Sequence, residues 1–252
     1  MEDRHFFRKF FKFTYNYGKI SSKSIKQVGA GILKLQGVLL DFDGTLGDTT
    51  DLIFASWQAT LEHYHQKQPS RKEIVSTFGL PLRDGLAAFL PGVPLEEALA
   101  VYREHNFKYH DIMIKSFPYV ADGLRQLKEQ GYKLAVVTSK KHYLAEKGLD
   151  ILQLRQYMDG VITCEECTEH KPKAEPMAKG AALLNLDPRA CLAVGDSPYD
   201  LMSGQAAGCR TTWVSWSPYD KETVNKFIIP DYTIDKLTDL VPLLARVNKE
   251  AK

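Results

Sequence analysis

Several features that would mark a specialised class of protein are scarce or missing in this chain of 252 residues. It has only four cysteines, its net charge is +2, and no stretch approaches the ~18–20 consecutive apolar residues of a membrane span. These shortages argue against a disulfide-rich scaffold, a membrane-spanning protein and a nucleic-acid binder. What remains is an ordinary chain, 44% hydrophobic, with enough length for one large domain or a domain with an insertion.

The few cysteines do not form a persuasive metal site. Cys164 and Cys167 make a single C-x-x-C pair without a second pair or a nearby histidine cluster, which is weak support for zinc. Cys191 and Cys209 stand among apolar or small residues and are interpreted as small core residues. We therefore favour a structural or incidental use of cysteine over metal or redox chemistry.

Positive charge is concentrated at the start of the chain. Residues 1–34 hold eight Lys or Arg against two acidic residues, so this segment carries about +6 and the remainder about −4. Its stretch HFFRKFFKFTYNYGK has no uninterrupted apolar core and does not resemble a signal peptide. A basic amphipathic helix on a membrane or partner surface is one interpretation. We favour a poorly ordered extension of a cytoplasmic protein, with no stable membrane association and no nucleic-acid partner.

From about residue 35, short apolar runs alternate with helical periodicity. The runs are rich in Val, Leu and Ile and mostly continuous, as expected for parallel strands buried on both faces. They are GVLLDFD, YKLAVVTS, DGVITCE, ACLAVGDS and TTWVSW, with a late strand at DYTI. Helical stripes lie between them, for example Val120, Leu124 and Leu127. This alternation predicts a doubly wound α/β domain.

One interval breaks that rhythm. Roughly ninety residues separate Asp43 from YKLAVVTS, far more than a normal crossover, and they contain no convincing strand. Ile53, Trp57, Leu61 and Tyr64 repeat at helical spacing, and LEEALAVYREHNFKYH continues in the same way. We expect a helical cap at 51–117, a core formed by 35–50 and 118–252, and an extension at 1–34.

Polar side chains follow four of the predicted strands. In an open α/β sheet these positions meet at the carboxyl edge, where ligands bind. Each has an ordinary explanation alone: the hydroxyls and the last two acids as helix caps, the lysine as a solvated side chain. Together they indicate a site, because a carboxylate at the edge of a core is costly to desolvate without a partner. The residues are Asp41, Asp43, Thr138, Ser139, Lys171, Asp196 and Asp200.

Phosphoryl transfer accounts for this set of residue types. Asp41 and Asp196 offer the hard oxygen ligands that Mg²⁺ prefers, and Asp41 is a candidate nucleophile on phosphorus. Asp43, two residues later, is placed to protonate the leaving group and then to deprotonate water. Turn amides at Gly44 and Thr45 are expected to hold phosphate oxygens.

Two further strand ends complete this chemistry. Thr138 and Ser139 would bind phosphate through a hydroxyl and neighbouring amides. Lys171 would offset the charge that develops during transfer.

The four segments DFDGT, VVTS, Lys171-Pro172 and GDSPYD resemble, in order, the motifs of the haloacid dehalogenase superfamily. The resemblance spans about 36–240 and implies a Rossmann-like core with a small mobile cap. It also implies that the Asp43 carbonyl joins Asp41 and Asp196 as a Mg²⁺ ligand. Asp200 is implied to support the residues that bind the metal and the phosphate, without being a ligand itself. One departure is Ala174, where the family often has proline, beside a second candidate lysine, Lys173.

Further stretches narrow the resemblance to one branch of that superfamily. TFGLPLRDGL, YREHNFKYHD and VSWS are similar to the phosphoglycolate phosphatases, especially to relatives that hydrolyse pyrophosphate. Other activities remain alternatives: a sugar-phosphate phosphatase, a phosphomutase like those that act on hexose phosphates, and more remotely a receiver-like signalling domain. True dehalogenases need no acid at the second aspartate, so Asp43 favours a phosphatase. A silent binding protein is disfavoured because every motif residue is present.

The predicted cap must recognise the leaving group. Arg83 follows GLPL, and Arg103, Asn106 and His110 are spaced i, i+3 and i+7 on one helix. Such a face suits a small anionic leaving group, although these residues are also compatible with a solvated helix surface. Phosphoglycolate and pyrophosphate are the two substrates that fit, and the resemblance favours pyrophosphate. We expect a monomer or a homodimer.

Overall fold

The computed structural model describes residues 33–251. The predicted extension at 1–34 therefore lies outside the described residues, except for Leu33 and Lys34. No helix of the described part is long and apolar enough to cross a membrane.

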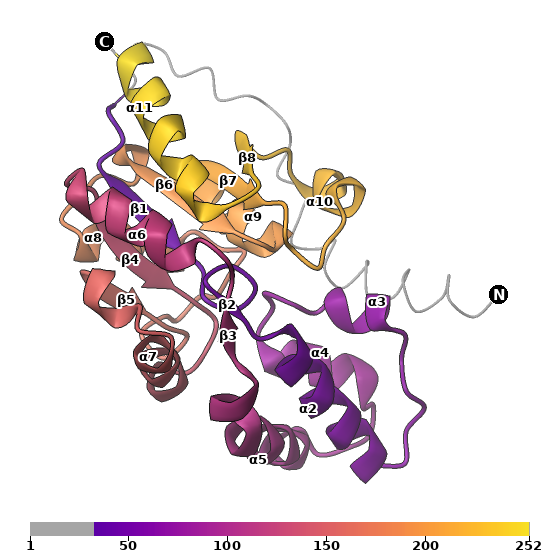
Figure 1. The fold of residues 1–252 in the computed structure, drawn as a ribbon. Helices are drawn as coiled ribbons and strands as arrows, with labels where there is room; N and C mark the ends of the chain where they lie inside the picture. The colour runs from indigo at the N-terminus through magenta and orange to yellow at the C-terminus, as the bar shows by residue number, and fades with distance from the viewer. Residues whose placement is uncertain (1–32, 252) are drawn as a thin grey trace. The chain divides into compact units, whose positions relative to one another are not determined.

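A six-stranded parallel sheet forms the centre of the described fold (Figure 1). Its strand order is β5-β4-β1-β6-β7-β8, so the chain winds outward from β1 in both directions. This confirms the predicted doubly wound α/β architecture, with the late strand included. The strands are β1 (Gly37–Leu40), β4 (Lys133–Val137), β5 (Gly160–Ile162), β6 (Cys191–Gly195), β7 (Arg210–Val214) and β8 (Tyr232–Ile234).

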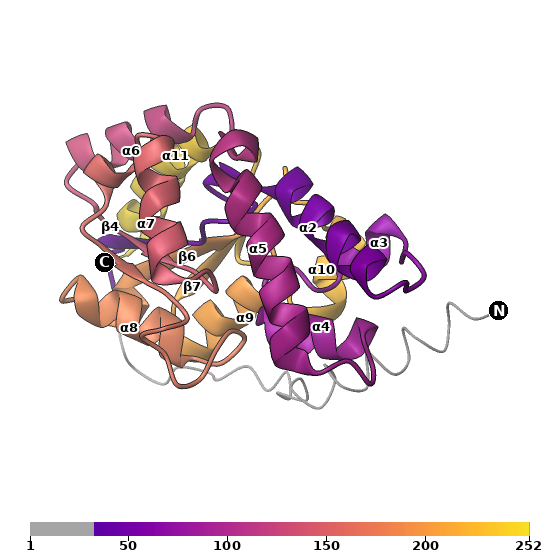
Figure 2. The ribbon, with the colours of Figure 1, turned by 90° about the horizontal axis from the view of Figure 1, so that it is seen from below.

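Helices cover both faces of the sheet, as Figure 2 shows. On one face α6 (Val120–Glu129), α7 (His142–Ile151) and α11 (Leu240–Glu250) pack against Val38 and Leu40. On the other face α8 (Glu175–Leu183) packs against Leu39, and α9 (Pro198–Ala207) lies beside it. Successive residues of β1 thus enter different cores, which is why its sequence is a continuous apolar run.

Four helices occupy the interval assigned to the cap. They are α2 (Thr50–His63), α3 (Arg71–Val75), α4 (Leu82–Phe89) and α5 (Leu95–Met113). Trp57 and Leu61 of the predicted stripe are buried, in a cluster that also contains Trp213 of β7 and Tyr219. A short helix, α10 (Lys221–Phe227), packs on α9 and contributes Val224 to that cluster.

The prediction that this interval contains no strand was wrong at its two ends. β2 (Gly47–Asp48) and β3 (Lys115–Ser116) form a small antiparallel sheet where the chain enters and leaves the helical segment. Each strand has only two residues, so no alternation of apolar and polar side chains could reveal it. The pairing nevertheless fixes the two connections side by side (Figure 1).

Candidate active site

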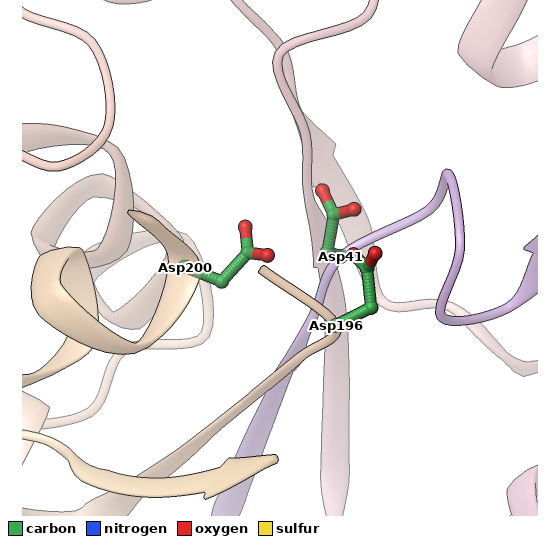
Figure 3. Close-up of side chains that lie close together, drawn as sticks. All are labelled: Asp41, Asp196 and Asp200. Carbon is green, nitrogen blue, oxygen red and sulfur yellow. The ribbon is translucent and has the colours of Figure 1, made fainter. Parts of the chain in front are cut away.

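Three buried aspartates meet at the carboxyl edge of the sheet (Figure 3). Asp41 follows β1, Asp196 follows β6, and Asp200 lies in the first turn of α9. One carboxylate oxygen from each lies within 4.8 Å of the others. The two central strands pair in register up to these positions, so the sequence brings Asp41 and Asp196 together by strand pairing alone.

Lys171 is the only counter-charge that contacts this cluster among the described residues. Its Nζ donates to Oδ1 of Asp41 at 2.8 Å, to Oδ1 of Asp200 at 2.6 Å and to the carbonyl of Val137 at 2.7 Å. The residue is 3% exposed, so the interpretation as a solvated lysine was wrong. Three acceptors use all three of its N–H donors.

Both carboxylate oxygens of Asp200 accept hydrogen bonds. Its Oδ1 accepts from Lys171, and its Oδ2 accepts from the amide and the hydroxyl of Ser197 at 3.0 and 2.6 Å. Ser197 in turn caps α9, with Pro198 at the first helical position. The capping interpretation was therefore right for Asp200 but not for Asp196, because Ser197 is the N-cap. Asp200 thus contacts both Lys171 and the start of α9, and its supporting role stays a prediction.

One carboxylate oxygen of Asp196 indicates a cation-binding site. Its Oδ2 is buried and has no hydrogen-bond partner among the described residues. Burial raises the pKa of Asp196 well above its usual value, and burial raises the pKa of Asp41 to about 7. When all three aspartates are ionised, one lysine leaves two negative charges uncompensated. A divalent cation held by Asp41 and Asp196 fits both the charge and the unpaired oxygen.

The buried lysine responds to the same surroundings in the opposite direction. Burial alone would lower the pKa of Lys171, but the neighbouring Asp200 and Asp41 outweigh it and raise this pKa. Lys171 therefore stays cationic, as an electrostatic role toward a phosphoryl group requires.

The carboxylate of Asp43 is turned to a different partner. Lys140 Nζ donates to its two oxygens at 2.9 and 3.2 Å. Sequence analysis missed Lys140, although one signal was available: this lysine directly follows the hydroxyl pair at the end of β4. The Asp43 side chain is 25% exposed and lines a cavity, which suits a residue that must reach a leaving group.

The turn after Asp43 is closed by its own backbone hydrogen bonds. The amides of Gly44 and Thr45 donate to the carbonyls of Gly47 and Phe42, at 2.8 and 3.3 Å. They are therefore engaged within the turn in this conformation. Gly44 matters for another reason: it has a φ of +82°, and a Cβ there would lie 2.5 Å from Oδ2 of Asp196. Only glycine lets the backbone approach this carboxylate.

Thr138 and Ser139 do not cap the helix that follows them. α7 begins at His142, and its N-cap Lys141 makes no side-chain capping bond. The Thr138 hydroxyl instead accepts from the Lys140 amide at 3.2 Å, and the Ser139 hydroxyl donates to the Gly79 carbonyl at 3.4 Å. Both residues line the same cavity as Asp41 and Asp43.

That cavity has a volume of about 290 Å³ and lies between the sheet edge and the inserted helices. Three of the four residues predicted to recognise the leaving group line it: Arg83, Arg103 and Asn106. Arg83 is half-exposed and pairs with Glu96 at 2.6 Å, and Asn106 donates to the Ser56 hydroxyl at 3.3 Å. An apolar wall completes the lining, with Ile53, Trp57, Phe78, Leu80, Leu82 and Tyr102.

His110 does not join the other cap residues. It is fully buried, pairs through Nδ1 with Asp111 at 3.0 Å, and is not among the residues that line the cavity. Seven residues of helix separate it from Arg103 by about 10 Å along the axis, so a shared face does not give shared surroundings. Burial lowers the pKa of His110, which disfavours a cationic role.

Comparison with known proteins agrees with this geometry. The model of the haloacid dehalogenase-like hydrolase family matches residues 38–214. The chain belongs to this family. The matched residues run from β1 to the end of β7 and so contain all three aspartates of the cluster, Lys171 and the inserted helices.

Relatives and solved structures support the same assignment. Pyrophosphatase PpaX of Bacillus mycoides is 36% identical over 216 residues, covering 86% of this chain and 100% of the relative, and PpaX of Bacillus cereus is 35% identical. A haloacid dehalogenase-like hydrolase from Bacteroides fragilis aligns with a TM-score of 0.76 at 25% identity, over 82% of this chain and 100% of that one.

A second structure shares the fold at lower identity. It is described as a predicted phosphoglycolate phosphatase from Haemophilus somnus and aligns with a TM-score of 0.73 at 22% identity, over 84% of this chain and 99% of that one. Together with the relatives named pyrophosphatase, the family assignment identifies the chain as a phosphatase of the haloacid dehalogenase type.

Proposed function

We propose that the protein is a Mg²⁺-dependent hydrolase of a small phosphate compound that carries a second anionic group. Pyrophosphate is the first candidate and phosphoglycolate the second. The observation that carries this proposal is the cationic part of the cavity beyond Asp43. It contains Lys140, Lys141, Arg83 and Arg103. The name of the relatives at 35–36% identity supports the choice of pyrophosphate.

The reaction has two steps on the proposed residues. A carboxylate oxygen of Asp41 attacks phosphorus, and the bond from phosphorus to the leaving oxygen breaks while Asp43 gives that oxygen a proton. Asp43 then takes a proton from water, which attacks the aspartyl phosphate and restores Asp41 as phosphate departs. Lys171 fixes Asp41 through Oδ1 and stays cationic throughout.

The metal is assigned to the same edge of the sheet. Asp41 and Asp196 would hold Mg²⁺ through side chains, and Asp43 through its carbonyl. When bound, the ion would supply positive charge to phosphate oxygens. The Thr138 hydroxyl, which accepts from the Lys140 amide, still has its own proton to donate to a phosphate oxygen.

Four other expectations remain proposals. They are a cap bounded by residues 51–117, a cytoplasmic location, a monomeric or homodimeric state, and substrate binding. In the last of these, Gly44, Thr45 and Ser139 bind phosphate, and Arg83, Arg103 and Asn106 recognise the leaving group.

The test is a substrate panel compared by kcat/KM: pyrophosphate, phosphoglycolate, β-glucose 1-phosphate and 5′-nucleotides, each with Mg²⁺. We expect pyrophosphate to give the highest value, followed by phosphoglycolate. A clear preference for the sugar phosphate would instead support the alternative of a sugar-phosphate phosphatase or phosphomutase. A preference for nucleotides would contradict the small-anion assignment.

A further inference from the structure

We infer that Lys140 contacts the substrate directly and recognises an anionic group on the leaving side of the phosphorus, next to Asp43. This inference rests on the proposed function and assigns to a residue of the core domain a recognition role that sequence analysis gave entirely to the cap. It starts from a count of hydrogen-bond donors on the two buried lysines of the site.

The two lysines differ in how many donors they have left. An ammonium group has three N–H donors. Lys171 spends all three, on Asp41, Asp200 and Val137. Lys140 spends two, one on each oxygen of Asp43, and has no third acceptor among the described residues. Lys171 is therefore saturated, whereas Lys140 has one donor to offer a ligand.

That remaining donor lies in the right place. Lys140 and Asp43 both line the cavity, and Lys171 does not. Asp43 is the proposed proton donor to the leaving oxygen, so a group that contacts its carboxylate lies on the leaving side of phosphorus. An anionic oxygen attached to that leaving group would be within reach of the same ammonium.

The position of Lys140 is fixed rather than adaptable. Its amide donates to the Thr138 hydroxyl at 3.2 Å, and its carbonyl accepts from the Cys164 amide at 3.4 Å. Its ammonium lies 5.5 Å from the centroid of the Phe42 ring, which also favours the cation. Ordering this lysine on substrate binding therefore costs little conformational entropy.

Among the described residues, the other three cations of the cavity, Lys141, Arg83 and Arg103, are exposed and less suited to the same task. The side chain of Lys140 is 7% exposed. That of Lys141 is 49% exposed and lies 3.7 Å from Glu165, and that of Arg83 is 53% exposed and paired with Glu96. Solvent screens exposed charges, whereas a nearly buried ammonium interacts strongly with an anion. Discrimination between leaving groups should therefore depend on Lys140.

Binding measurements with full-length protein and saturating Mg²⁺ test this assignment. The probes are imidodiphosphate, which has two phosphoryl groups joined by nitrogen, and orthophosphate, which lacks the second group. We expect Lys140→Met to weaken imidodiphosphate binding roughly ten- to a hundredfold, the usual value of a hydrogen bond to a charged group. Orthophosphate binding should change far less.

Lys128→Met is the matched control, because Lys128 also donates to both oxygens of one aspartate, Asp159, at 2.7 and 2.8 Å, and does not line the cavity. It should leave both affinities within about threefold of the original.

An equal loss of affinity for both probes in Lys140→Met would show that Lys140 serves only Asp43 and would overturn the inference. So would no loss, or a larger selective loss in Lys141→Met. Selective loss of imidodiphosphate binding without any pyrophosphate turnover by the unaltered protein would support Lys140 but contradict the proposed reaction.

Discussion

At the scale of single residues, the site contains two kinds of buried charge. Asp41, Asp200 and Lys171 satisfy one another, whereas Asp196 has an oxygen without a partner. The sequence was sufficient to locate these residues, because strand ends and motif spacing fix their backbone positions. It was not sufficient for Lys140, since a lysine in a loop is usually solvated and only the fold reveals its burial.

Replacement of the proposed nucleophile gives the first prediction. Asp41→Asn removes an attacking oxygen with almost no change of volume, so kcat should fall by about a thousandfold or more. The fold should persist, because Lys171 keeps Asp200 and the carbonyl of Val137 as acceptors. Steady-state turnover measures the first effect and circular dichroism the second. Substantial residual activity in a folded variant would contradict covalent catalysis by Asp41.

Gly44 gives a prediction in which strain and function can be separated. Gly44→Ala should destabilise the fold by about 1 kcal/mol through its positive φ and should also weaken Mg²⁺ binding, since the new Cβ would collide with Asp196. Gly131→Ala is the control: its φ of +83° is nearly the same, but nothing lies within 4 Å of a Cβ there. Chemical denaturation and Mg²⁺ titration of both variants test this. Equal effects on Mg²⁺ affinity would refute the proposed contact.

At the scale of elements, periodicity predicted most of the fold because burial repeats along each element. Four of the six strands, β1, β4, β5 and β6, are nearly continuous apolar runs because both of their faces are covered. The helical stripe at Trp57 and Leu61 faces a buried cluster. The elements that escaped prediction lack such a repeat. β2 and β3 have two residues each, and their pairing depends on where the inserted helices begin and end.

The start of α9 links helix stability to the site. Ser197→Ala should cost about 1 kcal/mol of stability and lower kcat, because Asp200 loses a hydroxyl partner and holds Lys171 less firmly. Ser70→Ala is a matched control, since Ser70 and Glu73 form the same capping box on α3, exposed to solvent. Thermal unfolding and turnover of both variants are the measurements. Equal loss of activity in the two variants would mean that Asp200 does not act through this cap.

At the scale of the whole molecule, the site exists because distant segments of the chain converge on one sheet edge. Asp41 and Lys171 are 130 residues apart in sequence, and Lys140 reaches Asp43 across 97 residues. The motif order indicated this convergence, and the inserted helices were expected from the length of the interval. The surroundings of individual cap residues were not predictable, because they depend on how each helix packs along its length, as His110 shows.

This convergence makes the folded state of the described domain sensitive to a divalent cation. The unfolded chain does not hold Asp41 and Asp196 together, so Mg²⁺ should bind the folded state alone and stabilise it by about 2.7 kcal/mol at a hundred times its Kd. The melting temperature should therefore rise with Mg²⁺ concentration, and EDTA should abolish turnover until Mg²⁺ is restored. Ca²⁺ should raise the melting temperature as well but inhibit the reaction, since it prefers more ligands and looser geometry.

The substitution Asp196→Asn tests where the cation binds. In this variant the buried oxygen without a partner is no longer anionic, so the rise in melting temperature with Mg²⁺ should shrink strongly. An undiminished rise in that variant would place the cation elsewhere, and full turnover in metal-free buffer would exclude the metal from the reaction.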